Sequence, residues 1–183
     1  SPNPRGWQMT HVSVTPMQWQ DRPCYVYCGS CGVAAVAADD GALLWDSTEW
    51  PSQFATCPSA LVLPEGRVFL CSGYGRTAGS LMLQVQKTAD QWRAEPLFRL
   101  TPQQFNAEQQ TPIFYRNHVL GVRKHGGGQL VCLDLQGKEI WNSGSDRFGH
   151  GPFLLADGLM LLLDDRGQLT QAEVSPEGYQ RLA

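Results

Sequence analysis

The stretch Leu130–Trp141 reads LVCLDLQGKEIW and contains the pattern that decides the fold. An apolar run ends in Leu133-Asp134, a short turn passes through Gly137, and a second apolar run closes on a tryptophan. The stretch Ala34–Trp45, AAVAADDGALLW, repeats this pattern, again with the tryptophan four residues after the turn glycine. Short apolar runs joined by Gly and Asp turns are typical of antiparallel hairpins, so we predict the same hairpin in both places.

The hairpin belongs to a repeat that runs through the chain. Trp45, Trp92 and Trp141 are spaced by 47 and 49 residues. The prolines that open the repeats are spaced by 42, 54 and 40 residues, and they are Pro16, Pro58, Pro112 and Pro152. A period of roughly 40 to 50 residues built from short strands indicates a β-propeller with one blade per repeat. We therefore predict one all-β domain, residues 1–183, of four-stranded antiparallel blades at about 11–50, 54–98, 110–145 and 149–183.

Two segments depart from the regular repeat. The run Leu159–Leu163, LMLLL, is apolar without alternation. A strand that is apolar on both sides must be covered on both faces, so we expect the fourth blade to lie between two neighbours. The polar segment Thr101–Gln110 lengthens the second proline spacing, and it is either a surface loop without a role or part of a binding face.

Composition excludes several classes of protein. The chain has 42% hydrophobic and 17% charged residues with 19 Gly and 12 Pro, which is typical of a turn-rich globular protein. The net charge of −3 argues against nucleic acid as a partner. The apolar runs are far shorter than the roughly 20 residues that cross a bilayer, so we expect no membrane span. The chain begins with Ser1 and no signal peptide is visible, so we expect a processed protein or a piece of a longer one.

The stretches Leu130–Trp141 and Ala34–Trp45 resemble the PQQ-like repeat family of β-propellers. The resemblance covers about residues 11–179. It implies that the closing tryptophans Trp45, Trp92 and Trp141, with the turn glycines Gly41 and Gly137, dock each blade onto the next. Rings of this family usually have eight blades, so the four blades are part of a larger ring of seven or eight blades, or complete one as a homodimer, or close alone. A kelch or WD40 propeller is the alternative fold, but the repeat lacks their Gly-His and Trp-Asp signatures.

The resemblance implies a function only broadly. The family includes quinoprotein dehydrogenases, the outer-membrane assembly lipoprotein of the BamB type and uncharacterised envelope proteins. Quinone enzymes of this fold need a pair of adjacent cysteines and ligands for Ca²⁺, and the chain has no Cys-Cys dipeptide. We therefore expect no PQQ, no Ca²⁺ and no enzyme, but a protein-interaction scaffold of the cell envelope or periplasm. Its partners would be other proteins or the remaining blades of a parent chain. A quinoprotein oxidoreductase is the enzymatic alternative.

A binding module for a small ligand or glycan is the third possibility. Thr56, Gln110 and His150 precede or lie near the opening prolines, where the chain crosses from one blade to the next. We expect these crossings to ring the mouth of the central channel, so the three side chains either meet a ligand or close the inter-blade turns by hydrogen bonds.

The other chemistry-bearing residues do not define a site. Cys28 and Cys31 form a CxxC that is open to three interpretations: ordinary thiols, a local disulfide or a metal pair. The pairs Asp39-Asp40 and Asp164-Asp165 lie beside Gly turns, where Asp is favoured for turn chemistry. We predict no catalytic residue and no metal ligand.

Overall fold

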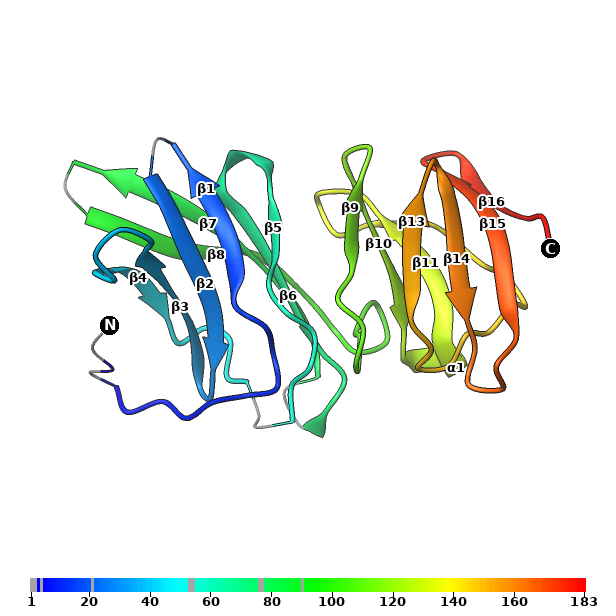
Figure 1. Ribbon diagram of the computed structural model, residues 1–183, viewed down its shortest axis with the longest axis horizontal. Coiled ribbons are helices and arrows are strands. Elements are labelled where there is room, and N and C mark those ends of the chain that lie inside the picture. Colours follow the sequence, from blue (N-terminus) through cyan, green and yellow to red (C-terminus); the bar gives the residue numbers. More distant parts are fainter. Residues whose placement is uncertain (1–2, 4, 21, 53–54, 76–77, 90) are drawn as a thin grey trace.

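The chain forms four sheets of four antiparallel strands (Figure 1) in a computed structural model that describes residues 3, 5–20, 22–52, 55–75, 78–89 and 91–183. Each sheet keeps the strand order of the sequence, so every connection within a sheet is a hairpin. The predicted all-β fold of four-stranded antiparallel propeller blades is confirmed. No helix among the described residues is long and apolar enough to cross a membrane.

The four sheets are called blades 1 to 4 in chain order. Blade 1 consists of β1 (Thr15–Trp19), β2 (Arg22–Gly29), β3 (Gly32–Ala37) and β4 (Leu43–Ser47). Blade 2 consists of β5 (Leu61–Leu63), β6 (Arg67–Ser72), β7 (Gly79–Thr88) and β8 (Gln91–Leu100), with the 3-10 turn η1 (Pro64–Gly66). Blade 3 consists of β9 (Ile113–Tyr115), β10 (His118–Arg123), β11 (Gln129–Leu133) and β12 (Glu139–Asn142), with the short helical turn α1 (His125–Gly128). Blade 4 consists of β13 (Phe153–Ala156), β14 (Leu159–Leu163), β15 (Leu169–Ser175) and β16 (Gly178–Arg181).

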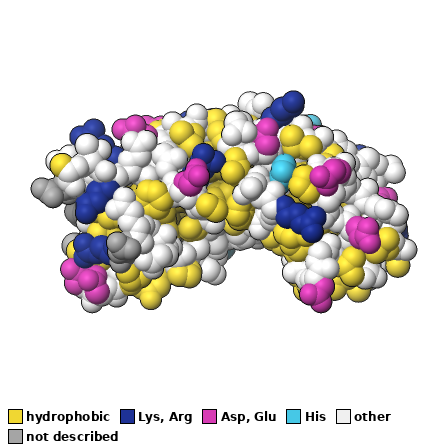
Figure 2. Space-filling model, turned by 90° about the horizontal axis from the view of Figure 1, so that it is seen from above, with side chains coloured by type: hydrophobic (Ala, Val, Ile, Leu, Met, Phe, Trp, Pro, Cys, Tyr) yellow, Lys and Arg dark blue, Asp and Glu magenta, His cyan; other side chains and the backbone are white. Residues whose placement is uncertain are grey.

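The blades follow one another along the long axis of the molecule (Figure 1). The first strands of neighbouring blades lie together, β1 beside β5 and β5 beside β9, and β4 lies near β8 at the other edge of the sheets. Seen from above, the molecule is an arch with a hollow along one long side (Figure 2). The described chain is therefore an open arc with two end sheets.

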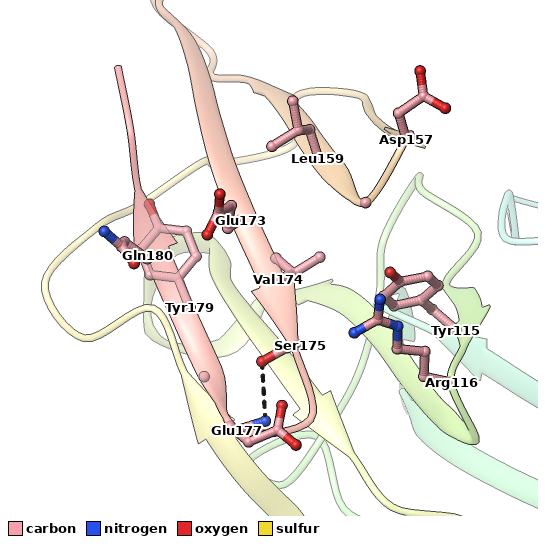
Figure 3. A pocket seen from close by; sticks show the side chains of 12 residues that line it. Tyr115, Arg116, Asp157, Leu159, Glu173, Val174, Ser175, Glu177, Tyr179 and Gln180 are labelled. Atoms are coloured by element: carbon pink, nitrogen blue, oxygen red, sulfur yellow. Dashed lines mark hydrogen bonds between the residues drawn. The ribbon is translucent and has the colours of Figure 1, made fainter.

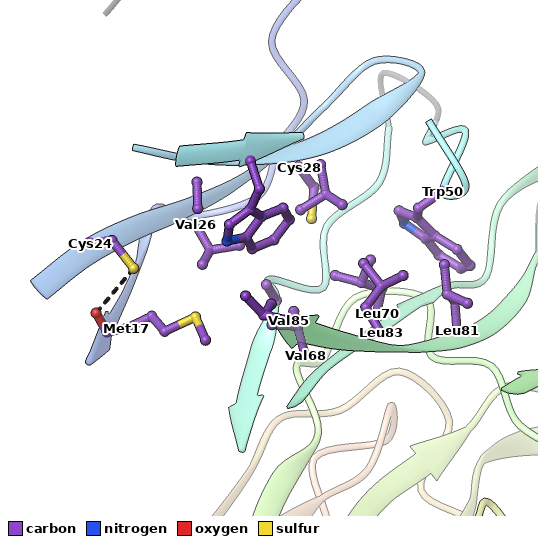
Figure 4. Packing of buried hydrophobic residues seen from close by; sticks show 14 of the residues in the cluster. Met17, Cys24, Val26, Cys28, Trp50, Val68, Leu70, Leu81, Leu83 and Val85 are labelled. Atoms are coloured by element: carbon purple, nitrogen blue, oxygen red, sulfur yellow. Dashed lines mark hydrogen bonds between the residues drawn. The ribbon is translucent and has the colours of Figure 1, made fainter. Parts of the chain in front are cut away.

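Each of the three apolar cores lies between two successive blades. Between blades 1 and 2, Val26 and Cys28 of β2 face Leu70 and Leu83 of β6 and β7 (Figure 4). The alternation of β2 sends Tyr25 to the opposite face, as the period of two requires. Burial of one such Val or Leu side chain stabilises the fold by about 1.5–3 kcal/mol, so the blades are held to one another mainly by apolar contact.

Blade 4 differs from its sequence-based expectation. Met160 and Leu162 are buried against blade 3. Leu159, Leu161 and Leu163 lie on the opposite face and are only half-buried. Within the described residues, this strand is therefore covered on one side, because blade 4 is the end of the arc.

The polar segment before blade 3 is also not a simple surface loop. Phe105, Asn106, Ala107 and Glu108 are buried, although most of the residues around them are polar. The Phe105 ring lies 5.9 Å from that of Phe69 in blade 2. It also lies under Gly121 of blade 3, where a Cβ would come within 2.7 Å of the ring. The segment is a wedge between two blades.

Candidate functional site

The inter-blade crossings are tied together along the whole arc, from the crossing before blade 1 to that before blade 4. Proline has no N–H to donate, and residues beside the opening prolines make the links instead. The backbone N–H of Ser13 donates to Ser59 Oγ at 2.9 Å, and the backbone N–H of Ser59 donates to Thr111 Oγ1 at 2.9 Å. Gln110 Nε2 donates to the carbonyl of Gly151 at 2.8 Å. Each link joins one crossing to the next and holds the first strands of the blades side by side.

Glu108 is the centre of an ionic network at these crossings. Its side chain is only 10% exposed, and its two carboxylate oxygens accept from different partners. Lys124 Nζ contacts Oε1, and His150 Nε2 lies 2.5 Å from Oε2. Lys124 Nζ also donates to the carbonyl of Gly73 at 3.1 Å. A carboxylate this deeply buried is costly unless it is paired and hydrogen-bonded, and here blades 2 and 3 and the crossing to blade 4 all take part.

Asp165 extends the network into blade 4. Its Oδ1 accepts the backbone N–H of His150 at 2.8 Å, and its Oδ2 lies 3.3 Å from His150 Nδ1. These bonds lower the pKa of Asp165, with the backbone N–H of His150 as the largest cause and the His150 ring as a further one. Glu108 also acts on the Cys57 thiol through its charge. Burial, and next the charge of Glu108, raise the pKa of the Cys57 thiol, which keeps it protonated and unreactive at neutral pH.

The three predicted channel-mouth residues lie on three different crossings. Gln110 and His150 come together near Gly151, and both already use their side chains in contacts between blades. Thr56 is buried, and its carbonyl accepts the backbone N–H of His11 at 3.1 Å. Ligand binding by these residues stays a prediction. Sequence reasoning missed Glu108, although Phe105 and Ala107, apolar residues inside a polar segment, were a signal that the segment is anchored.

The predicted docking tryptophans divide into two kinds. Trp45 pairs with Ala35 and Trp141 with Cys132, in each case beside a β-bulge. Trp45 lies in the core between blades 1 and 2, and Trp141 packs toward blade 4 and donates its Nε1–H to the carbonyl of Ser175 at 2.8 Å. Both tryptophans therefore pack between their own blade and the following one, and their docking role stays a prediction.

In blade 2, Phe98 has the position expected for Trp92. Phe98 pairs with Met82 beside the corresponding bulge, whereas Trp92 pairs with Lys87 near the far end of the β7–β8 hairpin. Trp92 packs on the core between blades 1 and 2, so it faces the preceding blade. Phe98 packs on the turn glycine Gly137 of blade 3, which has a left-handed φ of 83°. The regular spacing of the tryptophans pointed to Trp92 for this position. The position belongs to Phe98 because the β7–β8 hairpin is longer than the corresponding hairpins of blades 1 and 3. The other turn glycine, Gly41, also has a left-handed φ, of 69°.

A second candidate site lies at the opposite end of blades 3 and 4. This cleft has a volume of about 460 Å³ and lies between the β9–β10 turn and the β15–β16 hairpin (Figure 3). The Arg116 guanidinium lies 5.0 Å from the centre of the Tyr115 ring. A hydrogen bond from the Ser175 hydroxyl and one from the backbone N–H of Glu177 itself lower the pKa of the Glu177 carboxyl, and the positive charge of Arg116 lowers it further. Acidic and basic side chains and the two aromatic rings of Tyr115 and Tyr179 thus line one cleft.

The remaining motifs have local structural roles. All six cysteines are free, and burial raises the pKa of Cys28 to about 12, while Cys31 is exposed in a turn. Asp164 Oδ1 accepts the backbone N–H groups of Arg166 and Gln168, both at 2.8 Å, so it closes a turn. In the part of the chain that the structure describes, no three His, Cys, Asp or Glu side chains are grouped as metal ligands.

Comparison with known proteins gives a family match. The sequence profile of the family described as outer membrane protein assembly factor BamB matches residues 32–176. No curated protein matches the chain. Among solved structures, the crystal structure of BamB from Moraxella catarrhalis is similar with 11% sequence identity and a TM-score of 0.43. The match covers 96% of this chain and 64% of that one, so the chain spans less than two thirds of the length of that protein.

Proposed function

Because the chain belongs to the family of the outer membrane protein assembly factor BamB, we propose that it is a non-catalytic protein-interaction scaffold of the bacterial cell envelope. Its compartment is the periplasm, and its partners are proteins that take part in outer-membrane assembly. The observation that carries this proposal is the composition of the cleft between blades 3 and 4.

The cleft has the residue types that protein interfaces favour. Tyr, Trp and Arg are the commonest hot-spot residues of interfaces, and they act best in pockets that a partner can desolvate. Here Tyr115 and Tyr179 present rings, and Arg116 is exposed at the rim with its guanidinium stacked on Tyr115. The Tyr179 hydroxyl donates to Asp146 Oδ2 at 2.7 Å, which fixes the ring. Rigid aromatic side chains lose little entropy when a partner binds.

The β9–β10 turn supports the same interpretation. Arg116 and Asn117 both have left-handed φ angles, 47° and 61°. Such angles are uncommon in residues other than glycine and cost energy for a bulky side chain such as Arg. The strained turn holds the guanidinium over the mouth of the cleft, where it can pair with an acidic group of the partner.

Site-specific cross-linking in the periplasm tests the proposal. A photo-reactive residue at Arg116 is expected to form an adduct with a subunit of the outer-membrane assembly machinery, identified by mass spectrometry. The matched control is the same residue at Arg166, which is also an exposed arginine but lies at the other end of β14. Equal adducts from both positions, or an Arg116→Glu variant that keeps the adducts of a second cleft position, would contradict a docking cleft.

The enzymatic alternative has its own test. A quinoprotein would bind PQQ together with Ca²⁺ at one site per ring, and titration followed by absorbance reports that binding directly. Stoichiometric binding would overturn the non-catalytic assignment. The ligand-binding alternative at Thr56, Gln110 and His150 is less favoured because Gln110 Nε2 and both ring nitrogens of His150 already contact neighbouring segments.

A further inference from the structure

The His150 ring lies between two carboxylates that belong to different parts of the fold. Its Nε2 lies 2.5 Å from Oε2 of Glu108, in the wedge between blades 2 and 3. Its Nδ1 lies 3.3 Å from Oδ2 of Asp165, in the turn between β14 and β15 of blade 4. The ring therefore spans from the wedge to blade 4, and both of its polar atoms face an acidic group.

The backbone of the crossing holds the ring in this place. His150 is flanked by Gly149 and Gly151, and both glycines are packed too closely for a side chain. A Cβ on Gly149 would collide with the Asp165 carboxylate, and one on Gly151 would collide with the carbonyl oxygen of Leu163. The backbone N–H of His150 also donates to Oδ1 of Asp165 at 2.8 Å. None of these contacts involves the ring, so they hold the crossing beside blade 4 in both protonation states of the ring.

The two carboxylates together demand a doubly protonated ring. A neutral imidazole has one N–H donor and one nitrogen with a lone pair, whereas an imidazolium has two N–H donors and an ionised carboxylate only accepts. The backbone N–H of His150 is the largest cause of the lowered pKa of Asp165, which keeps that carboxylate ionised at neutral pH. Glu108 is paired with the ammonium of Lys124. A neutral ring can donate to one of the two carboxylates but must turn a lone pair toward the other, so only the imidazolium satisfies both.

Other titratable groups lie on the segments around the ring, and those are Cys57, Lys124, His125, Arg147, Asp164 and Arg166. Among the described residues, none of them hydrogen-bonds to the His150 ring. Lys124 contacts the other oxygen of Glu108, the Arg147 guanidinium donates to three backbone carbonyls, and Asp164 closes its own turn. Histidine is the side chain whose ordinary charge change falls between pH 5 and 8. Apart from His125, the ring is therefore the group of this set that changes charge in that range.

We propose that His150 is a pH-sensitive latch between the wedge and blade 4. With both nitrogens protonated, the ring joins Glu108 to Asp165 and ties blade 4 to blades 2 and 3. When the ring loses one proton as the pH rises, one of the two joins becomes a repulsive contact, and the latch opens on that side. This inference concerns the crossings between the blades, and it does not depend on the docking cleft at their opposite end.

The latch stabilises the fold more at acidic than at alkaline pH. The fold favours the imidazolium, so the stabilisation is complete below about pH 6.5, the ordinary pKa of histidine in an unfolded chain, and is lost as the pH rises. Carboxyl groups of ordinary pKa, about 4, stay ionised between pH 5.5 and 8, so this window isolates the ring. The effect is modest, because the side chains of His150 and Asp165 are 45% and 51% exposed.

Nitrogen NMR of the histidine rings in isotopically labelled protein tests the protonation directly. At pH 7, the His150 ring is expected to be doubly protonated at least about twice as often as that of His125, since a free imidazole is then mostly neutral. His125 is the matched comparison because it is exposed and lies on a neighbouring segment, α1. The His150→Gln variant assigns the signal. A His150 ring that is doubly protonated no more often than the His125 ring would overturn the proposal.

Thermal melts from pH 5.5 to 8 measure the effect of the latch on stability. Wild type is expected to melt about 2–4 °C above His150→Gln at pH 5.5, and this difference should shrink toward pH 8. Glutamine keeps a polar side chain but does not change its charge in this range. The control His125→Gln should show no such trend. A difference that stays constant with pH would indicate a structural role alone, and one that grows toward pH 8 would have the wrong sign; either result would overturn the latch.

Asp165→Asn shows whether the pH trend comes from the pair of carboxylates. The asparagine oxygen can still accept the backbone N–H of His150, while its NH₂ group can donate to a ring nitrogen. A neutral ring then satisfies both neighbours, because it donates to Glu108 and accepts from the amide. The pH trend between wild type and His150→Gln should therefore shrink at least about twofold when both chains carry Asp165→Asn. An unchanged trend in that background would overturn the assignment. Circular dichroism shows whether each variant is folded, and the NMR comparison on the wild-type chain decides if one is not.

Discussion

Replacement of Glu108 tests whether the buried network holds the blades together. Glu108→Gln keeps the shape of the side chain and removes its charge. Lys124 then loses its ionic partner, and His150 loses a charged hydrogen-bond partner. Breaking a fully buried ion pair costs about 3–5 kcal/mol, but the side chains of Lys124 and His150 are 39% and 45% exposed, so water compensates part of the loss. We expect a loss of about 2 kcal/mol in the free energy of unfolding.

Urea unfolding at neutral pH, followed by tryptophan fluorescence at fixed protein concentration, measures this loss. A decrease of about 2 kcal/mol corresponds to a fall in melting temperature of about 4–8 °C for a domain of this size. The control is Glu65→Gln, because Glu65 also forms an ion pair, with Arg67, but its side chain is 77% exposed. The control is expected to change stability by less than about 0.5 kcal/mol.

A double-mutant cycle identifies the partner. Glu108→Gln and Lys124→Met are each expected to lower the free energy of unfolding. The loss in the double variant should be smaller than the sum of the two single losses, with a coupling energy of about 1 kcal/mol or more. The reasoning is refuted if Glu108→Gln unfolds at the same urea concentration as the Glu65→Gln control. Strict additivity in the cycle would also refute it, because the carboxylate would then not depend on Lys124.

Three further predictions concern single positions. The lowered pKa of Asp165 means that its ionised form stabilises the fold, so in a series of thermal melts wild type should melt above Asp165→Asn at pH 7. This difference should shrink as the pH falls below about 4 and should vanish only once the pH is below the lowered pKa of Asp165. Gly137→Ala should lose about 1–3 kcal/mol more of the free energy of unfolding than Gly167→Ala, as measured by urea unfolding. Both glycines have a φ near 80°, but an added Cβ meets an aromatic ring at 2.6 Å only at Gly137. Equal losses would show that this contact does not affect stability. Iodoacetamide should label the exposed Cys31 rapidly in the folded protein and leave the buried Cys28 unmodified, which mass spectrometry of the peptides resolves; labelling of Cys28 at the same rate would contradict its burial.

The hairpin pattern was predictable because its cause is local. Short apolar runs, a turn that contains Asp and Gly, and a closing aromatic specify a pair of strands without reference to the rest of the chain. The stretches Ala34–Trp45 and Leu130–Trp141 both fold as the pattern predicts, into β3–β4 and β11–β12. Prediction was less reliable in blade 2, where a longer hairpin placed Phe98 rather than Trp92 beside the bulge. The spacing of the tryptophans does not reveal that the hairpin of blade 2 contains extra residues, because its turn sequence differs from that of the other repeats.

The candidate sites were only partly predictable. Gln110 and His150 were identified from their place beside the opening prolines, and they do lie at the crossings between blades. Glu108 was not identified, because nothing in a polar segment distinguishes a buried carboxylate from a solvated one. The cleft at Arg116 was missed for a related reason, since its walls come from turns and hairpins of two blades that are far apart in the sequence.

The sequence by itself determined the strands, their antiparallel pairing and the number of repeats, because hydrogen bonding within a blade joins residues that are close along the chain. Tertiary structure alone decided what lies between the blades, namely the wedge at Phe105 and the network around Glu108. These features depend on which faces of successive sheets meet. That choice is made by packing over long sequence separations, which a repeat pattern does not encode.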